Sequence, residues 1–141
     1  MQLDTLFTAA NSLAFFTWVV LCVAPYHTRV RTVIFGGVVM LLALTYTALF
    51  LSTFDMNMAN DMATLSGLAT LFSSKQAVLL GWIHYLAFDL VAGLYIAQNA
   101  KEHQLHKRVL IPFLLATFMA GPLGLFAYVL WRTVRTKQYT F

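Results

Sequence analysis

The chain has 141 residues, of which 60% are hydrophobic and 10% are charged, and its mean hydropathy is +0.75. These values exclude an ordinary soluble domain and predict one integral-membrane domain over residues 1–141. The net charge is +4, but the Lys and Arg residues stand in short groups beside apolar segments, where anionic lipid headgroups attract them. We therefore expect the lipid bilayer as a partner, and no nucleic acid.

Four apolar runs are each long enough to cross roughly 30 Å of hydrocarbon as a helix. They cover residues 6–24, 33–52, 76–98 and 109–131. Backbone groups in lipid must pair internally, and no run alternates with the period of a barrel strand. The predicted fold class is an all-α membrane protein with four transmembrane helices in an antiparallel bundle. The first residues lack a basic signal region, so we expect the first helix to be retained.

The connections between these runs differ in length. Two are short and make their flanking helices antiparallel neighbours. The third, at 53–75, is long and semi-apolar, and it predicts a short interfacial helix around 63–72, between the second and third spans. In such a bundle five basic residues lie on one side and four on the other, which leaves the orientation close to undecided. These residues are Arg29, Arg31, Lys101, Lys107 and Arg108 against Lys75, Arg132, Arg135 and Lys137.

The third run carries two ionisable residues, His84 and Asp89, near its middle. A charge at that depth costs roughly 3 kcal/mol on insertion scales, so such residues usually have a partner and a use. They are five residues apart, about 140° around a helix, so each should find its own partner on another helix. Candidate partners are Asn11, Ser12, Thr17, Thr45, Tyr46, Thr47 and Thr117.

Several roles are open to these two residues. Asp89 is either a protonated carboxyl that ties helices together or an acid, since low dielectric favours the neutral form. His84 is an interhelical hydrogen-bonding group, an acid or base, or a ligand of haem or metal. A second histidine at this depth is lacking in the sequence, so we expect no metal and no cofactor.

The fourth run contains a proline, Pro122, which has no N–H and leaves the carbonyl of Phe118 without its helical partner. Gly121 and Gly124 remove side-chain bulk beside it, so that the third helix or a flat ligand can approach the backbone. Aromatic residues of both helices could line a groove for a long apolar molecule such as a polyene or quinone. The predicted substrate-binding set is Trp82, Tyr85, Phe88, Gly93, Phe118, Gly121, Pro122 and Gly124.

Two sequence blocks are similar to the signature of a known family. GWIHYLAFDLVAGLYIAQNA begins at Gly81, and LATFMAGPLGLFAYVLWR ends at Arg132. They resemble the abscisic-acid-deficiency-four-like family, small four-helix membrane proteins whose plant members are required for making neoxanthin. The resemblance implies carotenoid modification, in which an epoxy end group is isomerised to an allenic alcohol without a redox cofactor. Epoxide opening needs an acid at the oxygen and a base at a neighbouring carbon, roles that Asp89 and His84 would share.

The leading hypothesis is therefore a membrane-embedded carotenoid or isoprenoid isomerase, or an essential partner of such an enzyme, acting between the third and fourth helices. A second hypothesis is a non-catalytic pigment- or quinone-binding subunit of a larger membrane complex. A third is a small proton-coupled transporter, working as a homo-oligomer through Asp89. The expected location is a bacterial inner membrane, or a thylakoid or plastid membrane in a photosynthetic lineage.

Overall fold

The computed structural model describes residues 2–54 and 56–137, and the elements assigned within them are helices joined by short turns. The first half of the chain forms α1 (Leu3–Val23), α2 (Thr28–Val33), the π-helix η1 (Ile34–Val39), α3 (Met40–Thr53), α4 (Met56–Asp61) and α5 (Leu65–Leu71). The second half forms α6 (Lys75–Glu102), α7 (Lys107–Met119) and α8 (Gly121–Thr136). The chain is therefore all-helical over its described residues, as predicted.

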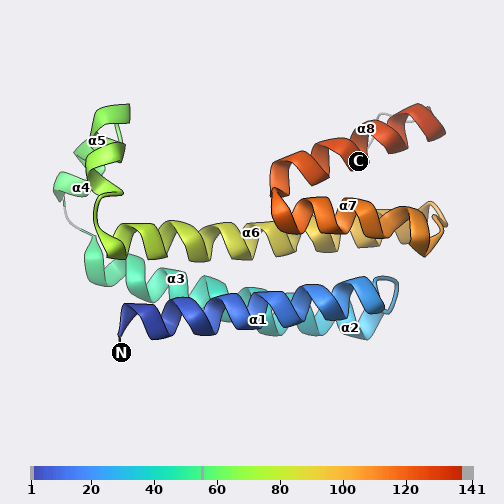
Figure 1. Cartoon of the computed structure of the whole chain (residues 1–141), viewed down its shortest axis with the longest axis horizontal. Helices are drawn as coiled ribbons and strands as arrows, with labels where there is room; N and C mark the ends of the chain where they lie inside the picture. The colour runs from blue at the N-terminus through green and yellow to red at the C-terminus, as the bar shows by residue number, and fades with distance from the viewer. Residues whose placement is uncertain (1, 55, 138–141) are drawn as a thin grey trace.

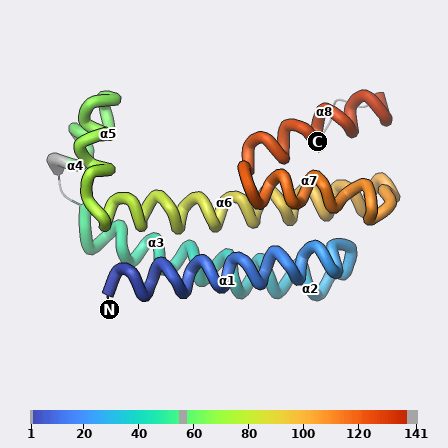
Figure 2. Tube along the Cα trace, in the orientation of Figure 1, coloured from blue at the N-terminus to red at the C-terminus, as the bar shows by residue number. Residues whose placement is uncertain are grey.

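Three helical segments are long and apolar enough to cross a membrane, and they are Leu3–Val23, Thr28–Thr53 and Lys75–Glu102. The predicted runs at 33–52 and 76–98 fall inside the second and third segments, and the run at 6–24 extends one residue past the end of the first. The three segments run lengthwise beside one another, with α6 in contact with both α1 and α3 (Figures 1 and 2). These helices make the protein an integral membrane protein, and α6 is its central element.

The fourth predicted span, at 109–131, is not a single helix. Helix α7 ends at Met119 and α8 begins at Gly121, because the intervening Ala120 has non-helical backbone angles of φ −156° and ψ 81°. The chain turns back there, and α8 returns toward the end at which α7 began (Figure 1). The two helices have 13 and 16 residues, so they rise about 20 and 24 Å, less than the hydrocarbon thickness. A four-helix transmembrane bundle is thus replaced by three candidate spans and a helical hairpin.

Proline and glycine explain why the break falls at this point. Pro122 cannot donate an N–H to a continuing helix, but it is well tolerated in the first turn of a new one, where it lies in α8. Gly124 lets the two arms of the hairpin close, since a Cβ there would lie 2.2 Å from the backbone nitrogen of Thr117. The proline predicted a local defect, and the structure makes it a reversal of the chain.

The second candidate span contains the π-helical turn η1. A π-turn winds wider than an α-helix, which makes it equivalent to one inserted residue and shifts the face that later residues present. Gly36 and Gly37 lie in this turn, and a Cβ at either would meet no atom within 4 Å. The turn thus sets which residues of α3 face α6, with Ile34 and Val39 buried in the core and the two glycines facing open space.

The connection at 53–75 forms two short helices, α4 and α5, across the end of the bundle (Figure 1). Thr64 caps α5 by accepting a hydrogen bond from the Gly67 N–H at 3.0 Å. Ser74 caps α6 in the same way by accepting from the Ala77 N–H at 3.2 Å. The helix predicted around 63–72 is therefore present as α5, and α4 precedes it.

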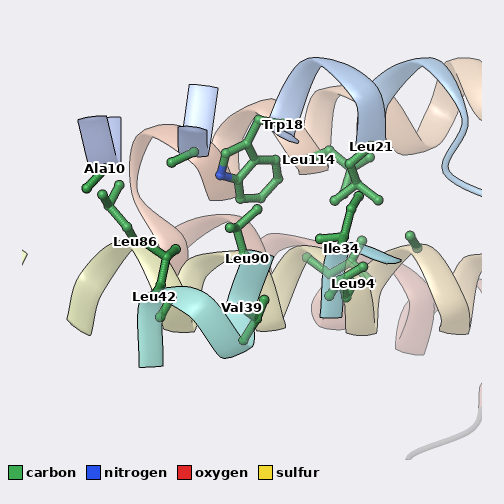
Figure 3. Packing of buried hydrophobic residues seen from close by; sticks show 14 of the residues in the cluster. Ala10, Trp18, Leu21, Ile34, Val39, Leu42, Leu86, Leu90, Leu94 and Leu114 are labelled. Carbon is green, nitrogen blue, oxygen red and sulfur yellow. The ribbon is translucent and has the colours of Figure 1, made fainter. Parts of the chain in front are cut away.

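The core lies where α1, α6 and α7 meet. Figure 3 shows Leu90 of α6 beneath the indole of Trp18, with Leu114 of α7 beside it. Gly93 makes this contact possible, because a Cβ there would lie 2.5 Å from the Trp18 ring. A small residue on the central helix thus admits the largest side chain of the first span.

The fold gathers basic residues at one end. The turn after α1 and the turn after α6 adjoin there, since the Tyr26 hydroxyl donates to the Leu105 carbonyl at 2.5 Å and Lys101 Nζ donates to Thr28 Oγ1 at 3.1 Å. The hairpin brings the end of α8 to the same side (Figure 2). Eight of the nine Lys and Arg residues lie at this end, and Lys75 lies at the other.

Candidate functional site

Asp89 lies against the break in the hairpin. The residue is 7% exposed, and its carboxyl group occupies the space beside Gly121, where a Cβ would lie 1.9 Å from Oδ1. The first turn of a helix carries unpaired N–H groups and the positive end of the helix dipole, both of which favour a carboxyl oxygen. Asp89 of α6 is therefore held at the start of α8.

Tyr85 joins Asp89 to both ends of the break. Its hydroxyl donates to the Met119 carbonyl, the last of α7, at 3.3 Å. The same oxygen also interacts with the Asp89 carboxyl and with the Gly121 N–H. Because a phenol has one proton, Tyr85 can accept from a protonated Asp89 while it donates to Met119, or donate to an ionised Asp89 instead. The pair therefore has two proton arrangements.

The second oxygen of the Asp89 carboxyl has no hydrogen-bond partner among the described residues. This atom, Oδ2, is buried. Buried polar atoms are paired in the large majority of cases, so each exception asks for an explanation. The carboxyl thus combines one oxygen fixed at the break with a second that is free for another group.

Aromatic side chains surround this position on the α1 and α7 side. Trp82 stacks on Tyr85 with ring centroids 5.4 Å apart, and its indole N–H donates to Asn11 Oδ1 at 2.8 Å. Phe118 packs against Trp18 at 5.7 Å. Asn11, expected as a partner of Asp89 or His84, bonds to Trp82 instead. The structure therefore brings Trp82, Tyr85, Asp89, Gly121 and Pro122 to one face of α6, with Phe118 at the end of α7.

His84 lies elsewhere. Its ring stacks on Phe88 with centroids 4.5 Å apart and contacts Tyr46 of α3 at 5.6 Å. It lines an apolar cavity of about 390 Å³ beneath α4 and α5. Phe88 is 62% exposed on the outer surface of α6. His84 and Asp89 thus lie on different faces of one helix with different neighbours, and Phe88 belongs to the His84 face.

A second buried polar group was missed by sequence reasoning. Asn99 Oδ1 accepts from the Tyr128 hydroxyl at 2.7 Å and from Arg132 at 3.1 Å, and Arg132 is only 1% exposed. Spacing could have revealed part of it, because Gly121, Gly124, Tyr128 and Arg132 share one face of α8. This group, Asn99–Tyr128–Arg132, fastens the far end of α8 to α6.

The fold and this site define a small integral membrane protein with a broken helical hairpin packed on a central span. The ABA4-like family model, described as ABA DEFICIENT 4-like, matches residues 5–128, and the chain belongs to this family. The match confirms the resemblance of the two sequence blocks and extends it over helices that showed none. No curated protein and no solved structure matches the chain. Membership gives the protein a membrane-associated, carotenoid-related role.

Proposed function

We propose that the protein is a membrane-embedded isomerase of a carotenoid or related isoprenoid that opens an epoxide ring, with Asp89 and Tyr85 as its proton-exchanging pair. The observation that carries the proposal is the Asp89 carboxyl, fixed at the hairpin break with Oδ2 unpartnered. A bacterial inner membrane, or a thylakoid membrane in a photosynthetic lineage, would supply the substrate from its lipid phase.

The reaction balances without an external acid, base or redox partner. The protonated carboxyl donates its proton to the epoxide oxygen, and the carbon–oxygen bond breaks to give an alcohol. A proton then leaves the neighbouring carbon as the new double bond of the allene forms. The carboxylate takes up this proton and returns to its starting state. A carboxyl group can do both, because its neutral form has one donor and its ionised form only acceptors.

Tyr85, in this proposal, holds the carboxyl in place and stabilises its ionised form. After proton donation, the phenol can turn its proton from the Met119 carbonyl to the Asp89 oxygen, while the Gly121 N–H still contacts the phenol. This exchange stabilises negative charge without water, as a preorganised donor does in other buried sites. His84 is left out of the pair because it packs against Tyr46 and Phe88 on the other face.

Access to Asp89 requires movement, since the residue is only 7% exposed. The first turn of α8 covers the Asp89 carboxyl, and Gly121 and Pro122 are the first two residues of that turn. We propose that substrate enters when this turn separates from α6, with Trp82 and Phe118 as the flanking aromatic surfaces. Gly124 and Gly93 keep the hairpin and α1 close to the site and have no direct contact with substrate in this scheme.

The test compares variants in cells that lack the gene and supply an epoxy carotenoid. Asp89→Asn is expected to lower the yield of the allenic product about 100-fold or more, and Tyr85→Phe to lower it less. Val78→Ala, at an exposed position on the same helix, is the control and should retain the conversion. Carotenoids are extracted and separated by chromatography. Conversion retained by Asp89→Asn would overturn the proposal.

A second experiment distinguishes an enzyme from a protein that only assists another enzyme. The purified protein is placed in liposomes that contain the epoxy carotenoid. Conversion by the purified protein supports an enzyme. Pigment that stays bound but unchanged would refute the isomerase and favour a non-catalytic pigment-binding subunit. Proton release on addition of a cationic drug, without any change of pigment, would likewise refute it and favour proton-coupled transport.

A further inference from the structure

The cavity on the other face of α6 is almost entirely apolar. It measures about 390 Å³ and lies between the end of α3, the start of α6 and the two short helices α4 and α5. We call residues 56–72, which contain α4 and α5, the hood. Side chains of Met58, Met62, Leu68 and Phe72 form the hood wall of the cavity. Its size falls in the range of small-molecule sites, which are mostly about 300–1,000 Å³.

The hood is held on the bundle by two side chains. Phe72 lies over Gly81, where a Cβ would come within 2.9 Å of its ring, and Met58 is 6% exposed. The two hood helices pack closely on each other, because a Cβ at Gly67 would lie 2.2 Å from the Asp61 carbonyl. The hood thus covers the cavity as two closely packed helices, and methionine side chains adapt readily to differently shaped apolar ligands.

His84 is the polar feature of this cavity. Its ring contacts Tyr46 and Phe88, and over residues 2–54 and 56–137 the structure gives it no hydrogen bond. The residue is exposed at the edge of the cavity, and on a spanning helix such exposure is to lipid. A neutral imidazole has one donor and one acceptor nitrogen, and leaving them unpaired in lipid is costly. Tyr46 is the other side chain with a polar group among the lining residues. An occupant that offers one oxygen would satisfy this site.

We propose that the cavity binds the ring end of an isoprenoid that carries one hydroxyl, with His84 hydrogen-bonded to that hydroxyl and the hood closed over the ring. The isoprenoid class rests on the proposed function, whereas the need for one hydroxyl rests on the cavity itself. A ring end fits the volume, and the remaining chain leaves the cavity along the apolar surface of α6. His84 is thus a recognition residue, separate from the proton exchange at Asp89.

The test is equilibrium binding to the purified full chain in lipid nanodiscs. The probes are a carotenoid with hydroxylated end rings and its counterpart without hydroxyls, followed by the shift of pigment absorbance. The wild type is expected to bind the hydroxylated probe about tenfold more tightly, the worth of one buried hydrogen bond. His84→Phe keeps the ring and removes its hydrogen bonds, so it should bind both probes equally. Equal binding by the wild type would overturn the proposal.

Three further variants distinguish loss of this site from loss of folding and from failure of the proposed function. Leu68→Trp fills the cavity and should weaken both probes, while Leu123→Trp, on the exposed surface of α8, should weaken neither. Unchanged binding in Leu68→Trp would place the pigment elsewhere and refute this site. Asp89→Asn should keep the preference for the hydroxylated probe. If that preference holds while the wild type converts no epoxide, the isomerase fails and the ring site stands.

Discussion

Gly121 has room for a hydrogen atom and little else. The Asp89 carboxyl fills the volume that a side chain would take, with Oδ1 1.9 Å from the ideal Cβ position. The same residue begins α8 and offers its N–H to the phenol of Tyr85. Because Gly121 has no side chain, α8 can pack against Asp89 of the central span, and the proposed proton pair lies at this contact.

Gly121→Ala is expected to destabilise the protein by about 2 kcal/mol, because the added methyl group must push α8 away from Asp89. Gly37→Ala is the matched control, since a Cβ at Gly37 meets no atom within 4 Å. That change should be neutral or stabilise the helix by up to about 1 kcal/mol. Thermal unfolding in detergent measures both. Equal stability of the two variants would show that α8 does not rest on Asp89.

Two variants of the Asn99–Tyr128–Arg132 group are expected to lose different amounts of stability. Tyr128→Phe removes one hydrogen bond and leaves Asn99 bonded to Arg132, so it should cost about 1 kcal/mol. Asn99→Leu removes the acceptor of both and strands a buried guanidinium, so it should cost roughly 3 kcal/mol. Unfolding in graded denaturing detergent compares them. A larger loss for Tyr128→Phe would contradict this account of how α8 is fastened.

Among the elements, η1 decides which residues of α3 face α6. Its wide turn sits upstream of Tyr46, which contacts His84 at a ring distance of 5.6 Å. A regular helix that kept all the same residues would turn the face of α3 by about 100°, because the wide turn would no longer absorb one of them. The π-turn therefore helps to shape the cavity beneath the hood, although it lies well before α4 and α5 in the sequence.

Deleting Val38 removes one residue from η1 and should convert it to a regular helical turn. Because the wide turn accommodates one inserted residue, losing the turn and the residue together should leave Tyr46 on the face that meets His84. The readout is crosslinking of a Tyr46→Cys, His84→Cys pair by a short thiol-reactive linker, in a Cys22→Ser background. The full-length pair and the deletion should both crosslink. Loss of crosslinking in the deletion would show that η1 does not act as one inserted residue.

The elements also show where sequence reasoning succeeds and where it stops. Length and apolar content predicted α1, α6 and residues 33–52 of the segment 28–53, because these properties depend on local sequence, but the helical start at Thr28 was predicted as part of a connection. The π-turn was not predicted, since it depends on how Ile34 and Val39 pack. Pro122 marked the right place, but a proline permits a kink or a reversal, and only the packing of Gly124 on Thr117 decides between them. The four-residue spacing of Tyr85 and Asp89 does predict that they share a face of α6, but the approach of Gly121 to Asp89 depends on the reversal and could not be foreseen.

The whole molecule has strong charge asymmetry once the hairpin is counted. Eight of the nine Lys and Arg residues lie at the end that holds residues 24–27, residues 103–106 and the end of α8. A continuous fourth span would have divided them almost evenly. Cytoplasmic flanks carry the excess of basic residues in membrane proteins. The fold therefore predicts that the end with eight basic residues faces the cytoplasm or stroma, whereas the sequence alone left the orientation undecided.

The start of α1 and the end of α8 should lie on opposite sides of the membrane, with the end of α8 in the cytoplasm or stroma. Reporter fusions to each end measure this, using one reporter active in the cytoplasm and one active outside it. Single cysteines in the 103–106 turn and in the hood, labelled from outside, provide the control. Both ends on one side would indicate an even number of crossings and contradict the hairpin.

The reversal at Ala120 also bears on how the chain is made. A segment that crosses the bilayer must carry whatever follows it to the far side, and here that would be Arg132, Arg135 and Lys137. In the topology predicted above, α7 and α8 dip in and return, so these three charges stay on the side where synthesis takes place. The hairpin can enter the lipid beside an already inserted α6, so the last step of biogenesis needs no translocation of charge.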